Sequence, residues 1–166
     1  MGREKLGVAD HFGRGYDYRG SFQYLRDGSS LTLEGVLFGE GRISAGSNGY
    51  RAYYYLKDHQ GNNRVVISST GTVEETNHYY PFGGVFAAAN NVQPYKYNGK
   101  EFDNKNGLNW YDYGARHYDA ALGRWHAVDP MAEKYCTFTP YSYCVNNPIC
   151  NVDLDGADWY IYHETG

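Results

Sequence analysis

The stretch from Ala115 to Pro130, ARHYDAALGRWHAVDP, holds two arginines, two histidines and two aspartates in sixteen residues, and a further aspartate follows at Asp153. Two carboxyl groups a few ångströms apart cannot both ionise cheaply, so one keeps its proton. The ionised one could take a proton from water, and the protonated one could donate to a scissile carbonyl or a leaving amine. A guanidinium could stabilise the ionised form. If the fold brings them together, Arg116, Asp129 and Asp153 are therefore candidates for an acid–base site.

The same side chains also have structural interpretations, and the residues alone leave both open. Arg116 and Arg124 could stack on tyrosine or tryptophan rings. Asp129 precedes Pro130, and its carboxylate could cap the start of a short helix by accepting from free amides. A capping role does not exclude catalysis.

Metal and thiol chemistry have weaker support. Asp153, Asp155 and Asp158 resemble part of a calcium loop, but their spacing is not that of an EF-hand, and a turn at Asp155-Gly156 is the simpler interpretation. The three cysteines, Cys136, Cys144 and Cys150, match neither a zinc site nor a disulfide framework, so we expect buried or idle thiols. A redox pair, or a nucleophile pair of Cys136 with His126, rests on residue type alone. We predict no metal and no cofactor.

Composition indicates which fold must position these groups. The 166 residues suffice for one domain with a core, and they include 19 tyrosines, 21 glycines and only two methionines. Tyrosine suits a half-wet strand, and glycine suits tight turns, so the chain is predicted to be all-β with short antiparallel strands and hairpins. The net charge of −4 does not favour nucleic-acid binding.

Two features of the sequence bear on the cellular location of the chain, its apolar runs and its N-terminus. No run approaches the roughly 20 apolar residues that span a bilayer. The charged N-terminus lacks a secretory signal, so the chain as it stands is expected to be cytoplasmic or of unknown location.

Alternating aromatic and polar residues predict strands within the ranges 15–25, 30–43, 53–56, 64–68, 72–80 and 94–119. Ser69-Thr70-Gly71 is typical of a hairpin turn, and Pro81 ends a strand because it cannot donate to a ladder. The range 84–92, GVFAAANNV, is ambiguous and could carry a short helical turn. A short helical segment is predicted near 129–135.

Seven motifs follow one another in a familiar order: DHQGNNRVV, GTVEETNHYYPFG, PYKYNGKEFD, GLNWYDYGARHYD, LGRWHAVDP, PYSYCVNNPI and DLDG. Over residues 16–156 the chain resembles the repeat-associated core domain of the Rhs/YD-repeat family, in the form common in Bacteroidetes and related to the C components of insecticidal toxin complexes. Single motifs such as YPFG are weak; the ordered set carries the resemblance.

The resemblance implies a slice of a spiral β-shell whose core domain closes one end around a variable C-terminal segment, often a toxin. It divides the chain into an N-terminal tail (1–14), YD-type repeat strands (15–49), the core domain (50–156) and a short C-terminal remnant (157–166). It implies a structural shell or plug module of a polymorphic-toxin-type protein, here without cargo because only nine residues follow Ala157. The parent family is secreted or on the cell surface.

The resemblance also implies an alternative function, single-turnover self-cleavage by an aspartyl-type site, with no turnover of an external substrate. Arg116, Asp129 and Asp153 correspond to its catalytic residues, and the cut falls after Ala157, before Asp158. Leu154 stands where the family has proline, and proline would fix the backbone there. The family's structural motif residues correspond to Tyr118, Asp119, Gly123, Arg124, Pro130, Asn147, Pro148 and Gly156.

A detached slice of such a sheet leaves unpaired strand edges. The sequence therefore predicts self-association, or pairing with another YD-repeat chain, through these edges. A toxin cargo or an immunity partner is expected only in a longer parent protein.

Overall fold

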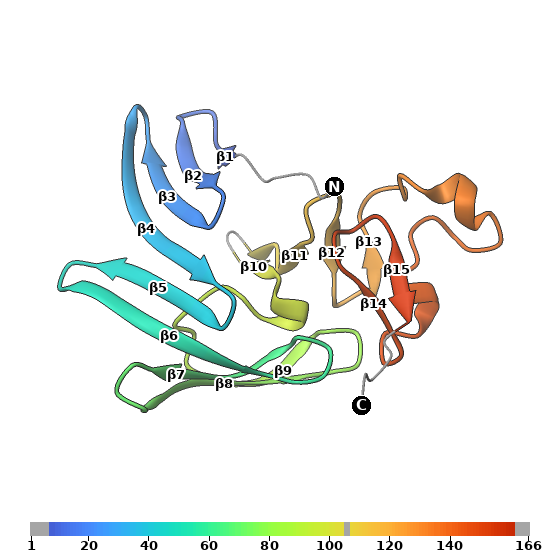
Figure 1. The fold of residues 1–166 in the computed structure, drawn as a ribbon. Coiled ribbons are helices and arrows are strands. Elements are labelled where there is room, and N and C mark those ends of the chain that lie inside the picture. The colour runs from blue at the N-terminus through green and yellow to red at the C-terminus, as the bar shows by residue number, and fades with distance from the viewer. Residues whose placement is uncertain (1–6, 105–106, 162–166) are drawn as a thin grey trace. The chain divides into compact units, whose positions relative to one another are not determined.

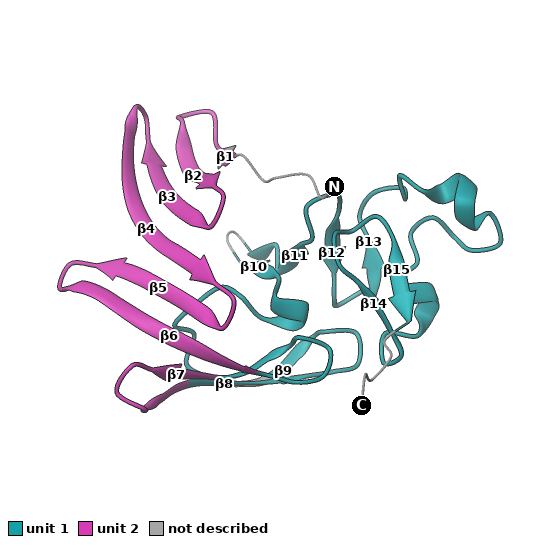
Figure 2. Ribbon diagram, in the orientation of Figure 1, with its two compact units in different colours: residues 1–2, 57–65, 75–166 teal, residues 3–56, 66–74 magenta. Residues whose placement is uncertain are grey.

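The computed structural model describes residues 7–104 and 107–161, and nearly all of its regular structure is antiparallel strand (Figure 1). The predicted all-β fold is confirmed. The chain divides into two compact units (Figure 2): unit 1 comprises residues 1–2, 57–65 and 75–166, and unit 2 comprises residues 3–56 and 66–74. Parts of the predicted tail (1–6), of the predicted strand range 94–119 (105–106) and of the predicted C-terminal remnant (162–166) lie outside the described residues.

Unit 2 is a meander in which each strand pairs with the next one along the chain. Glycines with positive φ at positions 20 and 28 stand in two of its tight turns, and Gly49, also with positive φ, directly follows a third; other residues would be strained there. The strands are β1 (Gly7–Ala9), β2 (Arg14–Arg19), β3 (Phe22–Asp27), β4 (Ser30–Phe38), β5 (Gly41–Gly46) and β6 (Gly49–Lys57).

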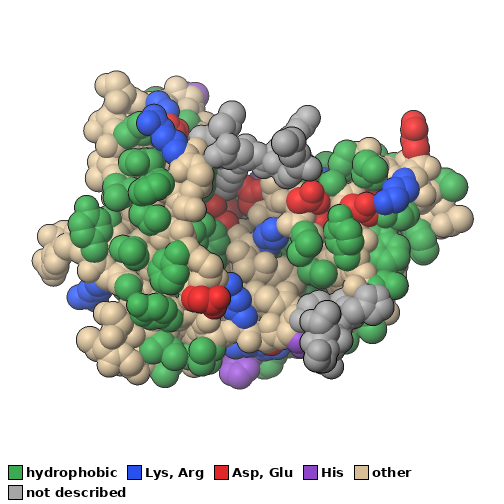
Figure 3. Space-filling model, in the orientation of Figure 1, with side chains coloured by type: hydrophobic (Ala, Val, Ile, Leu, Met, Phe, Trp, Pro, Cys, Tyr) green, Lys and Arg blue, Asp and Glu red, His purple; other side chains and the backbone are tan. Residues whose placement is uncertain are grey.

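One face of this meander carries exposed apolar side chains. Phe22 lies opposite Val36, and Phe38 and Tyr54 both lie opposite Gly41 on neighbouring strands. Val36 and Phe38 are two residues apart on one strand, so they share a face. The rings of Phe38 and Tyr54 are 5.8 Å apart, yet both remain exposed, as does Phe22. Figure 3 shows such hydrophobic side chains gathered over these strands.

The hairpin predicted at Ser69–Gly71 is confirmed. It joins β7 (Asn63–Ser68) to β8 (Val73–Tyr79). The Ser68 amide donates to the Thr72 carbonyl at 2.9 Å, and Gly71 has φ 83°. The chain passes between its two units along these strands.

The helical turn considered for residues 84–92 is wrong, because this segment contains strand β9 (Val85–Ala89). β9 pairs antiparallel with β8, with Thr76 opposite Ala89. Pairing with an adjacent strand satisfies the backbone groups, and that tertiary gain outweighs the helix propensity of three alanines. Asn90, with φ 65°, follows the strand.

Within the described residues, the rest of unit 1 contains two small sheets and three single-turn 3-10 helices. One sheet has the order β10 (Glu101–Asp103), β11 (Trp110–Asp112), β12 (His117–Asp119) and β13 (Arg124–Trp125); the other pairs β14 (Asn151–Asp153) with β15 (Trp159–Ile161). The 3-10 helices are η1 (Tyr97–Gly99), η3 (Ala132–Tyr135) and η4 (Cys144–Asn146). The helical segment predicted near 129–135 is η3. Among the described residues, no helix is long and apolar enough to cross a membrane.

The core of unit 1 is built from aromatic rings around Trp125. Its other buried members are Tyr79, Tyr97, Tyr111, Tyr113, Tyr118, Tyr143 and Cys144. A buried phenol must find an acceptor, and the YPFG motif supplies three. The hydroxyl groups of Tyr97, Tyr118 and Tyr111 donate to three consecutive carbonyls, those of residues 81, 82 and 83, at 2.9, 2.7 and 3.0 Å.

Gly83 in this motif can only be glycine. Its φ is 84°, and a Cβ there would lie 2.6 Å from the Tyr97 ring. The backbone carbonyl groups of the YPFG motif thus accept hydrogen bonds from three tyrosines of the aromatic core. The same core fixes the strands that carry the candidate site.

Candidate active site

The structure brings Arg116, Asp129 and Asp153 together within unit 1. Arg116 immediately precedes β12, Asp129 lies between β13 and η3, and Asp153 ends β14. Arg116 Nη2 lies 3.3 Å from Asp129 Oδ2 and 3.6 Å from Asp153 Oδ2. The side chains of Arg116 and Asp153 are each only 3% exposed. Both carboxylates therefore face one nitrogen of a buried guanidinium.

Every nitrogen of the Arg116 guanidinium has a partner. Besides the carboxylates, Nε donates to the Gly156 carbonyl at 2.5 Å and Nη1 to the Pro140 carbonyl at 3.3 Å. The guanidinium also lies 4.2 Å from the centre of the Trp125 ring. Burial lowers the pKa of Arg116, and Asp129 and Asp153 oppose that shift. Stacking and carboxylate binding, left as alternatives by the sequence, are both present.

Asp129 contacts both Arg116 and the chain just before η3, but the prediction that it caps the helix is wrong, because the N-cap is Met131 and no side-chain hydrogen bond caps this end. Its Oδ1 accepts from the Met131 amide at 2.7 Å, one residue before η3, while Oδ2 faces Arg116. Its own amide donates to the Pro140 carbonyl at 3.0 Å. The carboxylate is held at both oxygens, so its orientation is fixed.

Asp153 is the more deeply buried carboxyl group of the pair. Burial raises its pKa to about 6, against hydrogen bonds and the Arg116 charge, which act to lower it. Its Oδ1 accepts from the amides of Gly156 and Asp155 at 2.6 and 3.1 Å. A carboxyl group that keeps its proton into the weakly acidic range can act as an acid beside an ionised partner.

The predicted cut lies in the loop that joins β14 to β15, residues 154–158. The Ala157 amide donates to Asp155 Oδ1 at 3.1 Å. Asp158 accepts from Lys134 Nζ at 2.5 Å and from the Tyr135 hydroxyl, both on η3. The bond between Ala157 and Asp158 is therefore held on both sides in the intact chain.

A small recess lies beside Asp129. It is lined by Asp129, Ala132, Tyr135, Phe138, Thr139, Pro140, Ser142, Val145 and Trp159, and its volume is about 10 Å³. That is the lower limit for one water molecule. Hydrolysis needs one water, and the recess could admit it next to a carboxylate.

Strained backbone precedes β14. Cys144, Val145 and Asn146 all have positive φ, at 48°, 48° and 59°. Valine is a rare residue in this region because its branched side chain crowds the backbone. The Asn151 side chain ties β14 to this turn by donating to the Cys144 carbonyl at 3.0 Å.

The predicted motif residues have structural roles around the site. Tyr118 is in the aromatic core, Asp119 Oδ1 accepts from the Ala121 and Leu122 amides after β12, and Arg124 stacks 4.9 Å from the Tyr141 ring. Four of the remaining five lie in turns or make hydrogen bonds with other segments of the same chain. Gly123 and Gly156 have φ 67° and 79°, the Asn147 amide donates to the Cys144 carbonyl, and the Pro148 carbonyl accepts from Gln60. Pro130 follows Asp129 directly.

Sequence reasoning missed Lys100, whose Nζ donates to the Leu154 carbonyl at 2.5 Å. No local sequence pattern reveals a hydrogen-bond partner 54 residues away. The cysteines are free, with Cys144 buried and the other two exposed.

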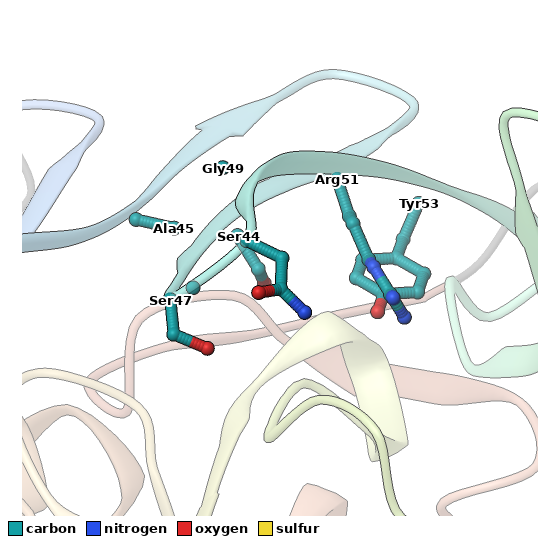
Figure 4. A pocket seen from close by; sticks show the side chains of 8 residues that line it. Ser44, Ala45, Ser47, Gly49, Arg51 and Tyr53 are labelled. Carbon is teal, nitrogen blue, oxygen red and sulfur yellow. The ribbon is translucent and has the colours of Figure 1, made fainter.

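A larger hollow, about 240 Å³, lies at the β5–β6 hairpin in unit 2 (Figure 4). Its lining includes Ser44, Ser47, Asn48, Arg51 and Tyr53. None of the predicted site residues lines it.

Comparison with known proteins shows what the sequence and the fold of this chain are similar to. No family model matches the chain. Salivary gland surface protein 1 of Aedes aegypti is 39% identical over 108 residues, which cover 63% of this chain and 3% of that protein. Toxin subunit YenC2 of Yersinia entomophaga is 38% identical over 104 residues, which cover 57% of this chain and 10% of that protein.

Solved structures agree at the level of fold. The crystal structure of TcdB2-TccC3 superposes with a TM-score of 0.71 at 24% identity, over 86% of this chain and 8% of the matched chain. The Tc holotoxin pore of Photorhabdus luminescens gives a TM-score of 0.71 at 20% identity, over 95% of this chain and 9% of the matched chain. The chain thus has the RHS-type all-β fold of toxin-complex components. Its relatives include a named toxin subunit, YenC2, of which it spans about a tenth.

Proposed function

We propose that this chain is a structural core segment of an RHS-type shell protein, acting as a shell or plug module. The observation that carries the proposal is the fold: an antiparallel meander that matches about a tenth or less of far longer toxin-complex chains. In this proposal the segment provides surface and strand edges for packing, and it does not catalyse the turnover of a substrate.

Two features of unit 2 support an associating role. β1 ends its sheet, and within the described residues no strand pairs with its outer side. An unpaired edge is a template for another strand. The apolar face around Phe38 and Tyr54 adds surface that a partner would bury. The proposed partner is a second copy or another YD-repeat chain, and light scattering over a concentration series tests this.

The finer parts of the assignment follow the sequence resemblance and are proposed with it. They are the Bacteroidetes form, the domain limits at 14, 49 and 156, and a parent protein that is secreted or on the cell surface. A toxin cargo or an immunity partner belongs to a longer parent.

A second function, single-turnover self-cleavage, is favoured by the convergence of Asp129 and Asp153 on Arg116. Asp129, held by Arg116, takes a proton from a water molecule, and the oxygen of that water attacks the Ala157 carbonyl carbon. Asp153, protonated below about pH 6, supplies the proton that the leaving Asp158 nitrogen needs. The C–N bond breaks, leaving a carboxylate on Ala157 and an amine on Asp158.

Intact-mass measurement tests self-cleavage. The purified chain is followed over days between pH 4 and pH 8, and we expect a product ending at Ala157 that forms fastest below about pH 6. Asp129→Asn and Asp153→Asn should abolish it. Asp27→Asn is the matched control, because Asp27 is exposed in unit 2 and outside the site. Full-length chain alone at every pH would rule self-cleavage out.

A further inference from the structure

Three consecutive carbonyl groups of the loop 154–158 accept hydrogen bonds from groups outside the loop. The Leu154 carbonyl accepts from Lys100 Nζ at 2.5 Å. The next carbonyl accepts from the Ala115 amide at 3.0 Å, and the third accepts from Arg116 Nε at 2.5 Å. Each of the three backbone carbonyl groups that follow Asp153 is thus held by a hydrogen bond. Of the three donors, only Lys100 lies apart from the 115–116 segment in the chain.

The position of Lys100 is itself well fixed. It follows η1, where its amide donates to the Tyr97 carbonyl and its carbonyl accepts from the Lys96 amide, both at 2.9 Å. Its ammonium group lies 5.1 Å from the centre of the buried Tyr113 ring. The backbone of Lys100 is fixed by the turn, and its side chain packs against a ring of the core. The side chain therefore loses little further conformational entropy when it binds a carbonyl group.

The charged groups that face Lys100 are carboxylates. Burial lowers the pKa of Lys100, and the charges of Asp153, Asp155 and Asp112 oppose that shift. The attraction is mutual, so the ammonium group favours the ionised form of Asp153. Lys100 therefore touches the site in two ways, through the Leu154 carbonyl and through its charge.

We propose that Lys100 is a positioning residue for the candidate site, fixing the Leu154 carbonyl and with it the turn between Asp153 and the scissile bond. Leucine leaves φ free at this position, whereas a proline would fix it. The hydrogen bond from Lys100 restrains the backbone there instead. This inference rests on the proposed self-cleavage for its functional meaning.

Two variants separate positioning from simple structural support. Lys100→Met keeps the apolar stem but removes the donor and the charge, whereas Lys100→Arg keeps both. We expect Lys100→Met to slow self-cleavage by at least about tenfold, since small misplacements of reacting groups are costly. Lys100→Arg should stay within about threefold of wild type. Equal rates for wild type and Lys100→Met would overturn the proposal.

The titration of Asp153, followed by carbon NMR of its carboxyl group in the full chain, decides the matter independently of cleavage. Removing a nearby cation from an intact site raises the Asp153 midpoint above its value of about 6. A loop that merely loosens would hydrate Asp153 and lower the midpoint toward 3.8. We expect the rise with Lys100→Met and no change with Lys100→Arg. A fall, or no change, with Lys100→Met would overturn the positioning role, whereas an uncleaved wild-type chain would refute self-cleavage alone.

Discussion

At the scale of single residues, Arg116 organises the site because its guanidinium group contacts three segments of the chain, at Asp129, at Pro140 and at residues 153–156. Nε holds the Gly156 carbonyl, Nη1 the Pro140 carbonyl, and Nη2 faces Asp129 and Asp153. Removing one partner of a buried charged cluster costs more than the pair contributes, because it leaves a charge uncompensated. The same contacts serve stability and the proposed chemistry.

The first prediction concerns Asp153 and pH. Its folded pKa, about 6, is above the ordinary 3.8, so its contribution to stability is complete below pH 3.8 and is lost as pH rises through 6. Asparagine does not titrate. Relative to Asp153→Asn, the wild-type free energy of unfolding should therefore fall by about 2 to 3 kcal/mol between pH 3.8 and pH 7. Urea denaturation of both proteins at several pH values measures it, and parallel curves would contradict it.

The second prediction concerns Gly156. Its φ is 79°, and a Cβ would lie 3.0 Å from both the Arg116 amide nitrogen and Tyr113 Cβ. Gly71 has a similar φ, 83°, but open space around it. Both glycine-to-alanine changes incur the left-handed penalty of about 1–2 kcal/mol. Gly156→Ala should destabilise by about 1 kcal/mol more, from the added contacts. Equal losses in thermal unfolding would show that the turn relaxes freely.

Much of the site could be predicted at this scale, and the reason is chemical. The guanidinium and carboxylate groups of Arg116, Asp129 and Asp153 are of the types that acid–base chemistry uses. The ordered motifs around them relate these residues to the catalytic residues of the family that the chain resembles. Lys100 and the Pro140 carbonyl could not be predicted. The sequence does not distinguish Lys100 from a solvated lysine. Every residue has a backbone carbonyl, so the sequence does not show which carbonyl will accept from Lys100 or from Arg116. Only the folded structure shows these partners.

At the scale of elements, turns rather than strands position the site. The strands around it have only two or three residues, and the site residues lie at their ends or in the segments between them. Alternation and turn residues predicted the hairpin at Ser69–Gly71. They failed at β9, because alanine-rich sequence carries no alternation and the pairing with β8 decided the outcome.

The third prediction tests the strained turn at Val145. A valine at φ 48° carries a left-handed penalty of roughly 1–2 kcal/mol that asparagine largely avoids. Val145→Asn should therefore stabilise the chain by about 1 kcal/mol. Chemical denaturation checks this against Val73→Asn, an exposed valine in strand β8 whose replacement removes no such strain. If Val145→Asn destabilises as much as Val73→Asn, packing of the valine outweighs the strain.

At the scale of the whole molecule, unit 2 leaves a strand edge and apolar side chains exposed. Its sheet ends at β1, and the chain matches small portions of long toxin-complex chains. The all-β class could be predicted from tyrosine and glycine content. The division into two units could not, since the boundary runs through β7 and β8, where the sequence pattern does not change.

The structural role is tested most directly by the molar mass of the chain in solution, measured by light scattering over a concentration series. We expect a molar mass that rises with concentration above the 18.8 kDa of one chain. Ala9→Lys, which places a charge on the exposed edge strand β1, should suppress the rise. Thr70→Lys, which adds the same charge at the β7–β8 turn, should leave it unchanged. A chain that stays monomeric at every concentration would contradict the central claim.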